Sequence, residues 1–395
     1  MKEKSIKSAY SHYINSKEIK NSKSGEEYYR VKNTAIVNRK KRVVVDSSTI
    51  LDFNPFAANH KIPNGSYRVL VDQKLQYLLG NGITTEDNES LKELDKMSSK
   101  RTFLKLLKEL VLEAANKGSA WIYLYKDRGD LKFKKIPREQ LHPVYNMDGE
   151  LEKMYRFYKS PQGVVALEYD FKGVTTYLKQ EEGFKVLSTR PHYIKTLKGG
   201  NKILSEEGFS FHKIPFIKLK NDIYEDSDLD KVKSLIDIYD IIESDFACNI
   251  DDMQDAFFTL KGYSGDAETA FEFLQELKAT KAIPINETGD VGVHQLQIPT
   301  EAREKLLDRL NIEIFTTGMG VDTAKLSGGS LTNVHIKAMF SNLDLKCDGL
   351  EEEIREFIYK LMEFINIERG IEMPFNYSFN RALIINKEDL TDSIG

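Results

Sequence analysis

Two pairs of aspartates in this chain of 395 residues have the spacing that is most typical of a catalytic site. Asp228 and Asp230 form a D-x-D pattern, and Asp251 and Asp252 are adjacent. Nucleases use paired carboxylates to hold two metal ions, so each pair is a possible metal site. Each pair also lies in a helical pattern with many other acids and no histidine to complete a site. We therefore expect no catalytic residues and no bound metal.

The other residues that often carry chemistry lack the spacing of a site. None of the seven histidines pairs with another His or Cys at zinc-ligand spacing. Gly80-Asn81-Gly82 lacks the third glycine of a dinucleotide-binding turn, and no P-loop, HExxH or Gly-x-Ser-x-Gly sequence occurs. The loop Ser327-Gly328-Gly329-Ser330 precedes a helical pattern, so it either binds phosphate through backbone amides or acts as a hinge before an N-cap serine. We predict no cofactor and no enzyme activity.

The composition is that of a soluble globular protein with two or three domains, since 41% of the residues are apolar and 30% are charged. No apolar run reaches 18 residues, and the N-terminus has no apolar core after its basic residues, so neither a membrane span nor a secretion signal is predicted. Cys248 and Cys347 lack CxxC spacing and are interpreted as reduced thiols in a cytosolic setting.

The charges are distributed unevenly along the chain. Residues 1–45 contain twelve Lys or Arg and four Glu, whereas residues 221–260 contain twelve Asp or Glu and two Lys. This uneven distribution of charge indicates regions that face different partners, or else two separately solvated faces. For the basic segment 30–42 we rank an acidic protein surface ahead of DNA.

The longest predicted element is a helix of almost 40 residues at about 331–370, interrupted by a single glycine, Gly349. It would be about 57 Å long at ~1.5 Å per residue. Its apolar residues recur at helical spacing on one face: Leu350, Ile354, Phe357, Ile358, Leu361 and Ile365. Such a long helix is rare in compact enzymes and common in assemblies around a channel, which favours an architectural role.

Helices and strands alternate in blocks ahead of this helix. Residues 1–27 are predicted to be an arm or a frayed helix, and two helices follow at about 66–80 and 89–117. The first places Tyr67, Leu70, Val71, Lys74 and Leu78 on one face. Residues 119–220 contain short aromatic and β-branched runs with a turn about every ten residues, which predicts an antiparallel meander.

Two further helices, at about 226–257 and 299–315, flank an insert at 262–298. Within the insert we predict a helix over 267–277, capped by Asp266, and two strands at 281–286 and 291–298. The first flanking helix has an acidic face and an apolar stripe with a period near 3.5, which predicts packing against a partner helix. The residues predicted to pack are Leu229, Val232, Ile236, Tyr239, Phe246, Ile250, Leu306 and Leu310.

In this order the motifs resemble the phage portal protein family of the SPP1 type over about residues 25–370. The matching stretches are YYRVKN at 28–33, KIPNG at 61–65, RVLVDQK at 68–74, YLLG at 77–80, DLD at 228–230, LIDIYD at 235–240, Ser244-Asp245, Asn249-Ile250, LKGY at 260–263 and SGGS at 327–330. The resemblance implies an α+β portal-type fold and a ring, usually of twelve copies, at one capsid vertex of the virion, assembled in the host bacterial cytoplasm. The resemblance further implies that double-stranded DNA is packaged and later ejected through the ring without sequence recognition.

The resemblance also implies a domain plan. Its parts are an N-terminal arm (1–27), a wing (28–225), stem helices (226–261 and 299–317), a clip (262–298), a tunnel loop (318–330), a long tunnel helix (331–370) and a reduced crown (371–395). The clip is expected to contact the terminase large subunit and then a head–tail connector. The wing is expected to contact the major capsid protein and scaffold.

Two sets of site residues follow from this plan. The residues implied to face DNA around the tunnel loop are Asp322, Thr323, Lys325, Ser327, Gly328, Gly329, Ser330 and Thr332. Those implied to contact terminase or the connector from the clip are Glu287, Thr288, Gly289 and Asp290. The alternatives are a minor head or adaptor protein without a pore, and a capsid-associated nuclease that uses the aspartate pairs.

Overall fold

The computed structural model describes residues 2–40, 43–44, 50–51, 58–86, 88–99, 101–181, 183–199, 202–252, 257–261, 290–294, 299–323 and 333–381. The chain divides into two compact units. The first comprises Met1–Val37, Pro63–Asp237 and Asn311–Gly395, and the second comprises Asn38–Ile62 and Ile238–Leu310. The fold is thus a mixture of helices and strands, as the α+β prediction requires at this coarse level.

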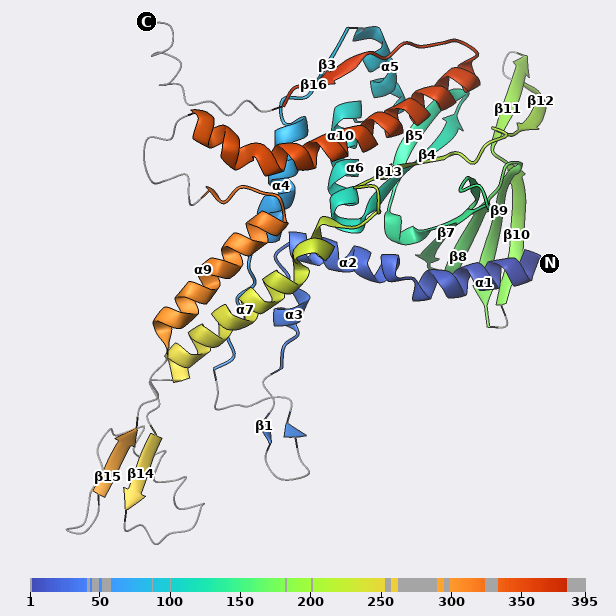
Figure 1. The fold of residues 1–395 in the computed structure, drawn as a ribbon. Helices are drawn as coiled ribbons and strands as arrows, with labels where there is room; N and C mark the ends of the chain where they lie inside the picture. Colours follow the sequence, from blue (N-terminus) through green and yellow to red (C-terminus); the bar gives the residue numbers. More distant parts are fainter. Residues whose placement is uncertain are drawn as a thin grey trace, which may run out of the picture. The chain divides into compact units, whose positions relative to one another are not determined.

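The strands of the first unit form three main antiparallel groups (Figure 1). A three-stranded sheet has the order β13-β4-β5, from Phe216–Lys220, Ser119–Asp127 and Asp130–Ile136. A five-stranded meander has the order β10-β9-β8-β7-β6, from Gly183–Pro191, Gly173–Gln180, Gly163–Tyr169, Leu151–Ser160 and Leu141–Tyr145. A hairpin joins β11 (Tyr193–Gly199) and β12 (Lys202–Phe209).

The single meander predicted for residues 119–220 is therefore wrong in its extent. The antiparallel pairing is present, but Pro137 and the short 3-10 helix η1 (Arg138–Gln140) separate β5 from the five-stranded sheet. Strand β13, which comes much later in the chain, pairs with β4, and Lys218 lies opposite Trp121. Such a distant pairing leaves no mark in the local alternation of residues, which is why the sequence pattern did not reveal it.

Helices cover the three-stranded sheet and supply the largest core. They are α4 (Ser66–Leu79), α5 (Asn88–Met97), α6 (Phe103–Lys117) and the 37-residue α10 (Asn333–Arg369). The predicted long helix is confirmed in α10, whose buried residues include Leu350, Ile354 and Leu361. A short ladder pairs β16 (Tyr377–Phe379) with β3 (Ile83–Thr85), so the segment after α10 contributes to the same unit.

The predicted single helix at 89–117 is wrong, because α5 ends at Met97 and α6 begins at Phe103. The backbone N–H of Phe103 donates to the Asp95 carboxylate at 2.6 Å. Thr102 is the N-cap of α6, and its side chain accepts from the N–H of Lys105. A side-chain cap of this kind satisfies an N–H that lacks an intrahelical partner, so it favours a new helix start.

The N-terminal residues form two packed helices, which corrects the prediction of an arm or a frayed helix. Helix α1 (Lys2–Asn15) buries Ile6 and Ala9 against aromatic residues of the five-stranded sheet, including Tyr155 and Phe157. Helix α2 (Lys17–Tyr29) packs against α6, and a Cβ at Gly25 would lie only 1.9 Å from the carbonyl oxygen of Asn116. Glycine is required there by this close approach of two backbones.

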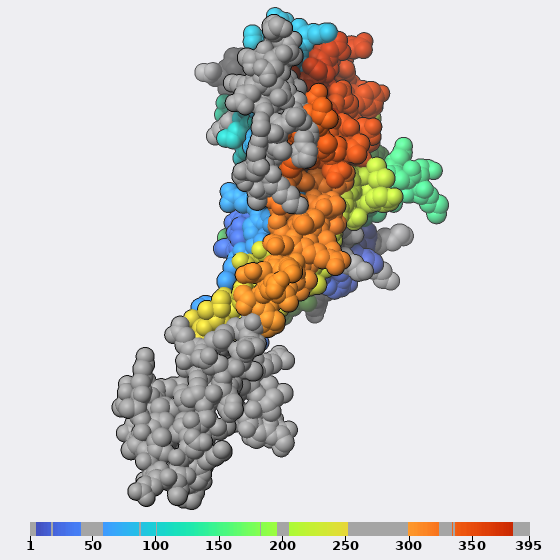
Figure 2. Space-filling view, turned by 60° about the vertical axis from the view of Figure 1, so that its left-hand side comes forward, coloured from blue at the N-terminus to red at the C-terminus, as the bar shows by residue number. Residues whose placement is uncertain are grey.

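The second unit contains parts of two long helices, α7 (Asp228–Asp252) and α9 (Thr300–Thr317), which continue into the first unit. Figure 2 shows α9 (orange) with one face exposed along its length. The unit also contains the paired strands β14 (Phe257–Lys261) and β15 (Asp290–His294), and the pair β1 (Val43–Val44) and β2 (Ile50–Leu51). The short helix α3 (Thr34–Val37) lies just before this unit in the chain.

Candidate functional site

The first turn of α7 is fixed by a reciprocal cap that is visible in the sequence Ser227-Asp228-Leu229-Asp230. The backbone N–H of Asp230 donates to the Ser227 hydroxyl at 3.2 Å. In return, the N–H of Ser227 donates to the Asp230 carboxylate at 3.1 Å. This arrangement is a capping box, which satisfies two free N–H groups at a helix start. Asp230 is therefore engaged in helix capping, not in a D-x-D metal pair.

The other member of that pair, Asp228, lies in a buried ionic cluster that joins α7 to α4 and α10. Its carboxylate is 3.1 Å from the Lys74 ammonium and 3.2 Å from that of Lys346. The amide of Asn221 donates to it at 2.9 Å, and Lys74 also donates to the Asn221 side chain at 2.6 Å. Lys346 further donates to the carbonyl of Gly318, at the end of α9. We call these four side chains the Asp228 cluster.

The pKa values in the Asp228 cluster follow from burial and from the two cations. Burial alone would raise the pKa of Asp228, but the ammonium groups of Lys346 and Lys74 and the Asn221 amide outweigh it and hold this pKa well below its usual range. Burial lowers the pKa of Lys74, and Asp228 offsets only part of that effect. The cluster thus anchors the start of α7 through charges that are almost entirely buried.

Part of the acidic face predicted for α7 is paired with cations of the same chain. Within the second unit, Arg39 donates to both carboxylate oxygens of Asp245, at 2.9 and 3.0 Å. A ring nitrogen of His60, Nε2, lies within hydrogen-bond distance of the Asp251 carboxylate. The basic and acidic segments that the sequence sets far apart therefore meet inside one copy. The spacing of charges along the chain gave no sign of this pairing.

This pairing gives a test on Arg39. Arg39→Met is expected to destabilise the second unit by about 1–2 kcal/mol, because it removes a bidentate, half-exposed bond to Asp245. Thermal unfolding followed by circular dichroism measures the change. Arg30→Met is the control, since its ion pair to Glu26 is more exposed. Equal midpoints for the two variants would show that the Arg39 bond contributes nothing.

The residues predicted to pack along α7 and α9 differ in how far a single copy of the chain buries them. Four of them are buried in the single chain: Leu229, Val232, Ile236 and Leu310. Tyr239 and Phe246 are half-buried, and the Arg303 guanidinium lies 5.8 Å from the ring centre of Phe246, which joins the two helices within the second unit. Ile250 and Leu306 are exposed by 53% and 44%. The stripe is therefore only partly covered by one copy.

The structure describes only part of the other predicted site residues. Asp322 accepts a hydrogen bond from the Asn311 amide, and Thr323 is exposed next to it, whereas Lys325, Ser327, Gly328, Gly329, Ser330 and Thr332 lie outside the described residues. Glu287, Thr288 and Gly289 also lie outside them, as do the predicted strand 281–286 and the predicted helix 267–277. Asp290 begins β15, opposite Lys261.

The predicted end of the helix at 226–257 is wrong, since α7 ends at Asp252 and residues 257–261 form strand β14.

The long helix α10 carries a residue that the sequence reasoning missed. Arg381 follows β16 and forms ion pairs with Asp344 and Asp348 at 2.5 Å and with Glu351 at 2.7 Å. The three carboxylates recur at helical spacing on α10, a signal that predicts a shared cation. This contact ties the segment after α10 back to the helix.

Within the described residues, no group of three or more His, Cys, Asp or Glu side chains is arranged to hold a metal ion. Both cysteines are free and buried, and burial raises the pKa of Cys347 to about 11. Among the helices that the structure describes, none is both long and apolar enough to cross a bilayer.

Comparison with known protein families gives a match over almost the whole chain. A family model described as phage portal protein, SPP1 Gp6-like, matches residues 9–395. The chain belongs to this phage portal protein family. The family, the role of portal protein of a tailed bacteriophage and the location in the virion, all predicted from the sequence, are thereby confirmed.

Two portal proteins are similar over nearly the whole chain. The portal protein of Clostridium phage phiCD119 is 30% identical over 392 residues, which cover 93% of this chain and 83% of that protein. The portal protein of Bacillus phage SPP1 is 26% identical over 394 residues, which cover 94% of this chain and 76% of that protein.

Two solved structures of gene transfer agent particles are also similar, each at 9% identity. A chain from the neck of an empty particle has a TM-score of 0.45 and covers 80% of this chain and 81% of its own. A chain from the virion of a native particle has a TM-score of 0.40 and covers 84% and 83%.

Proposed function

We propose that copies of this portal protein join side by side into a closed ring, usually of twelve, at one capsid vertex. Double-stranded DNA enters through the opening during packaging and leaves through it at ejection. The match to the portal family over residues 9–395 supports this role. In the ring, α7 and α9 form the stem, residues 262–298 the clip, residues 318–330 the tunnel loop, and α10 the helix behind that loop.

The ring is supported mainly by apolar side chains of the two proposed stem helices that one copy of the chain leaves uncovered. Ile238 and Ile250 on α7 and Leu306 on α9 are between 44% and 53% exposed in the single chain. Each of these side chains is uncovered in the single chain and so is available for burial against another copy. A heterologous interface of this kind generates a ring when its rotation closes.

DNA is held weakly and without base recognition in this proposal. Each Lys or Arg that neutralises a phosphate strengthens binding, so a sliding contact needs few of them. The carboxylate of Asp245 already pairs with Arg39 of its own copy, which reduces the field that it presents to a duplex. Contacts to the phosphate backbone are assigned to the basic or polar tunnel-loop residues Lys325, Ser327 and Thr332.

The partners follow from the same assignment. The clip turn Glu287–Asp290 contacts the terminase large subunit during packaging and a head–tail connector afterwards. The wing contacts the major capsid protein and scaffold. The chain supplies architecture to this machine and no catalysis of its own.

The loop assignment is tested by replacing Gly328 and Gly329 together with Val. We expect packaged DNA to fall at least about tenfold while rings still form, because two β-branched residues restrict the backbone that glycine leaves free. DNA yield per particle is the measurement. Gly349→Val is the control, since a Cβ at this position on α10 meets nothing within 4 Å. Normal packaging by the double variant would contradict a moving loop.

The nuclease alternative makes an opposite prediction. It requires divalent-metal-dependent cutting of DNA that is lost in Asp251→Asn. In the structure Asp251 pairs with His60, so we expect no such activity to depend on it. The adaptor alternative differs in having no central opening.

A further inference from the structure

Helix α9 ends in a closed turn that leads the chain into the proposed tunnel loop. The N–H of Gly320 donates to the Phe315 carbonyl at 2.9 Å, and the N–H of Met319 donates to the Thr316 carbonyl at 3.1 Å. These are the two bonds of a Schellman motif, in which the residue after the helix is left-handed. Met319 takes this conformation with φ 53°, although glycine is usual there. A side chain in this conformation costs free energy, so contacts from outside α9 must hold the turn.

Gln73 of α4 supplies such a contact at the next residue, Val321. Its side-chain amide donates to the Val321 carbonyl at 2.7 Å, and its side-chain oxygen accepts from the Val321 N–H at 3.0 Å. One side chain thus satisfies both backbone groups of Val321, as a neighbouring antiparallel strand would. The side chain of Val321 is 2% exposed and belongs to the largest core. Val321 is therefore held through its backbone and its side chain.

Two glycines bring this part of the backbone against Leu70 of the same helix α4. A Cβ at Gly318 would lie 2.5 Å from one methyl carbon of Leu70, and a Cβ at Gly320 would lie 2.2 Å from the other. Leu70 is 2% exposed, so a methyl group at either glycine would displace packed side chains. Lys346 of α10 also donates to the Gly318 carbonyl at 2.9 Å. We call residues 318–322 the loop anchor.

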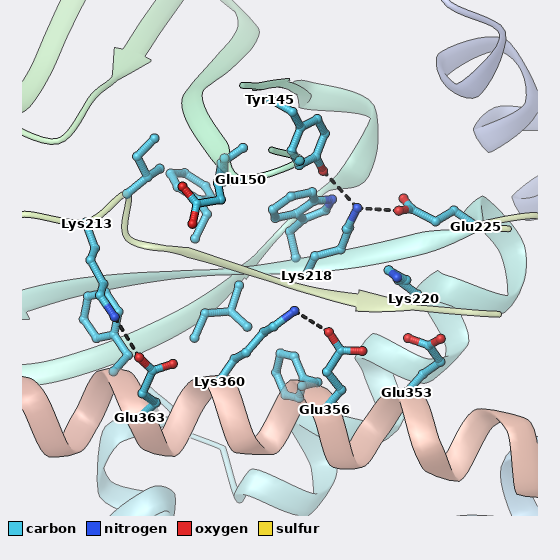
Figure 3. Close-up of a pocket in the computed structure, with 18 residues that line it drawn as sticks. Tyr145, Glu150, Lys213, Lys218, Lys220, Glu225, Glu353, Glu356, Lys360 and Glu363 are labelled. Carbon is cyan, nitrogen blue, oxygen red and sulfur yellow. Dashed lines mark hydrogen bonds and ion pairs between the residues drawn. The ribbon is translucent and has the colours of Figure 1, made fainter. Parts of the chain in front are cut away.

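The helices that hold the loop anchor are themselves fixed in the first unit. On α4, Gln73 is followed by Lys74, which pairs with Asp228, so adjacent residues hold the loop anchor and the start of α7. Helix α10 packs along β13 (Figure 3), where Phe357 of the helix and Ile217 of the strand belong to one core. All of these residues lie in the same compact unit, so the loop anchor does not depend on how the two units are placed.

We propose that Gln73 is a positioning residue for the tunnel loop, because its two bonds to Val321 fix the point from which the loop enters the DNA tunnel. The inference rests on the proposed function, in which the loop contacts DNA. It divides the loop into the fixed loop anchor and a contacting part that begins at Thr323. A fixed Asp322 keeps a phosphate contact at Lys325 within about 11 Å, at ~3.8 Å between consecutive Cα atoms.

Amide hydrogen exchange in rings of the full chain, measured by mass spectrometry, tests the loop anchor. Gln73→Met keeps the length of the side chain without its two hydrogen-bonding groups, so peptides that cover 318–322 should exchange about tenfold faster. Peptides from the buried face of α10 should keep their rates. Gln76→Met is the control, because Gln76 is exposed on the same helix. Unchanged exchange at 318–322, or faster exchange throughout the chain, overturns the inference.

The positioning role has a readout of its own. DNA packaged per particle should fall at least about threefold in Gln73→Met and stay normal in Gln76→Met, because a contact that is not held in place forms less often. Normal packaging by Gln73→Met with a loosened loop anchor overturns the positioning role while the proposed function stands. Absence of rings in the unmodified chain overturns the proposed function as well.

Gln73→Glu separates hydrogen bonding from packing and also serves if Gln73→Met forms no rings. The two side chains have the same shape, but an ionised carboxylate cannot donate to the Val321 carbonyl. Exchange at 318–322 should therefore rise and DNA yield should fall in Gln73→Glu as well. Unchanged exchange and yield in this variant would show that Gln73 acts by packing alone and would overturn the proposal.

Discussion

Replacing Asp228 with Asn is expected to destabilise the first unit by about 3–5 kcal/mol, because it leaves Lys74 and Lys346 buried without a negative partner. The side chains of these lysines are only 2% and 10% exposed, so water cannot take the place of the lost carboxylate. Urea unfolding followed by tryptophan fluorescence measures the loss, since Trp121 lies in the same unit. The start of α7 should loosen first, and ring assembly should weaken with it.

Asp226→Asn is the matched control, since this neighbouring side chain is exposed. Equal stability of the two variants would show that the Asp228 cluster does not anchor α7. The pH dependence gives a second check. The pKa of Asp228 is held below its ordinary value of about 3.9, so its contribution is present at neutral pH and is lost as the pH falls below about 4. Asp228→Asn should lack that part of the acid sensitivity.

Replacing Gly118 with Ala is expected to cost about 3 kcal/mol or more, the second large effect. Gly118 follows α6 with φ +80°, and a Cβ there would lie 1.9 Å from the carbonyl oxygen of Glu225 in the segment that leads into α7. The backbone of that segment must move to admit the methyl group. Its displacement should also disturb Asn221, whose N–H donates to the Gly118 carbonyl. Thermal unfolding of the purified variant is the measurement.

Gly149→Ala separates the clash from the backbone conformation. Gly149 has a similar φ of +78°, but a Cβ at that position meets nothing within 4 Å. It should therefore cost only about 1 kcal/mol, the penalty of the left-handed conformation alone. If Gly118→Ala and Gly149→Ala are equally stable, the close approach to Glu225 has no energetic weight.

Local patterns in the sequence were sufficient for helices α4 and α10. The stripe from Leu350 to Ile365 predicted α10, and the face that includes Lys74 predicted α4 and placed a lysine among apolar residues. A lysine on such a face indicates a buried counter-charge, but the residue that supplies it, Asp228, lies far along the chain. Periodicity reports which face of an element is buried and says nothing of what covers it.

Three of the failures share that cause. The split of 119–220 into several sheets depends on β13 returning to β4, and the strand at 257–261 depends on its pairing with β15. The bond between Arg39 and Asp245 joins segments that were interpreted as facing different partners. Each is a contact between distant residues, whose energy is not encoded in any short window. The motif order, by contrast, was enough to predict the family, because several separated stretches agreed.

The mass and shape of the purified assembly test the central claim most directly. Native mass spectrometry combined with electron microscopy should show closed rings of this chain around a hole slightly wider than a DNA duplex, and particles should carry the ring at one vertex. A protein that stays monomeric at micromolar concentration, or particles whose unique vertex lacks it, would contradict the account.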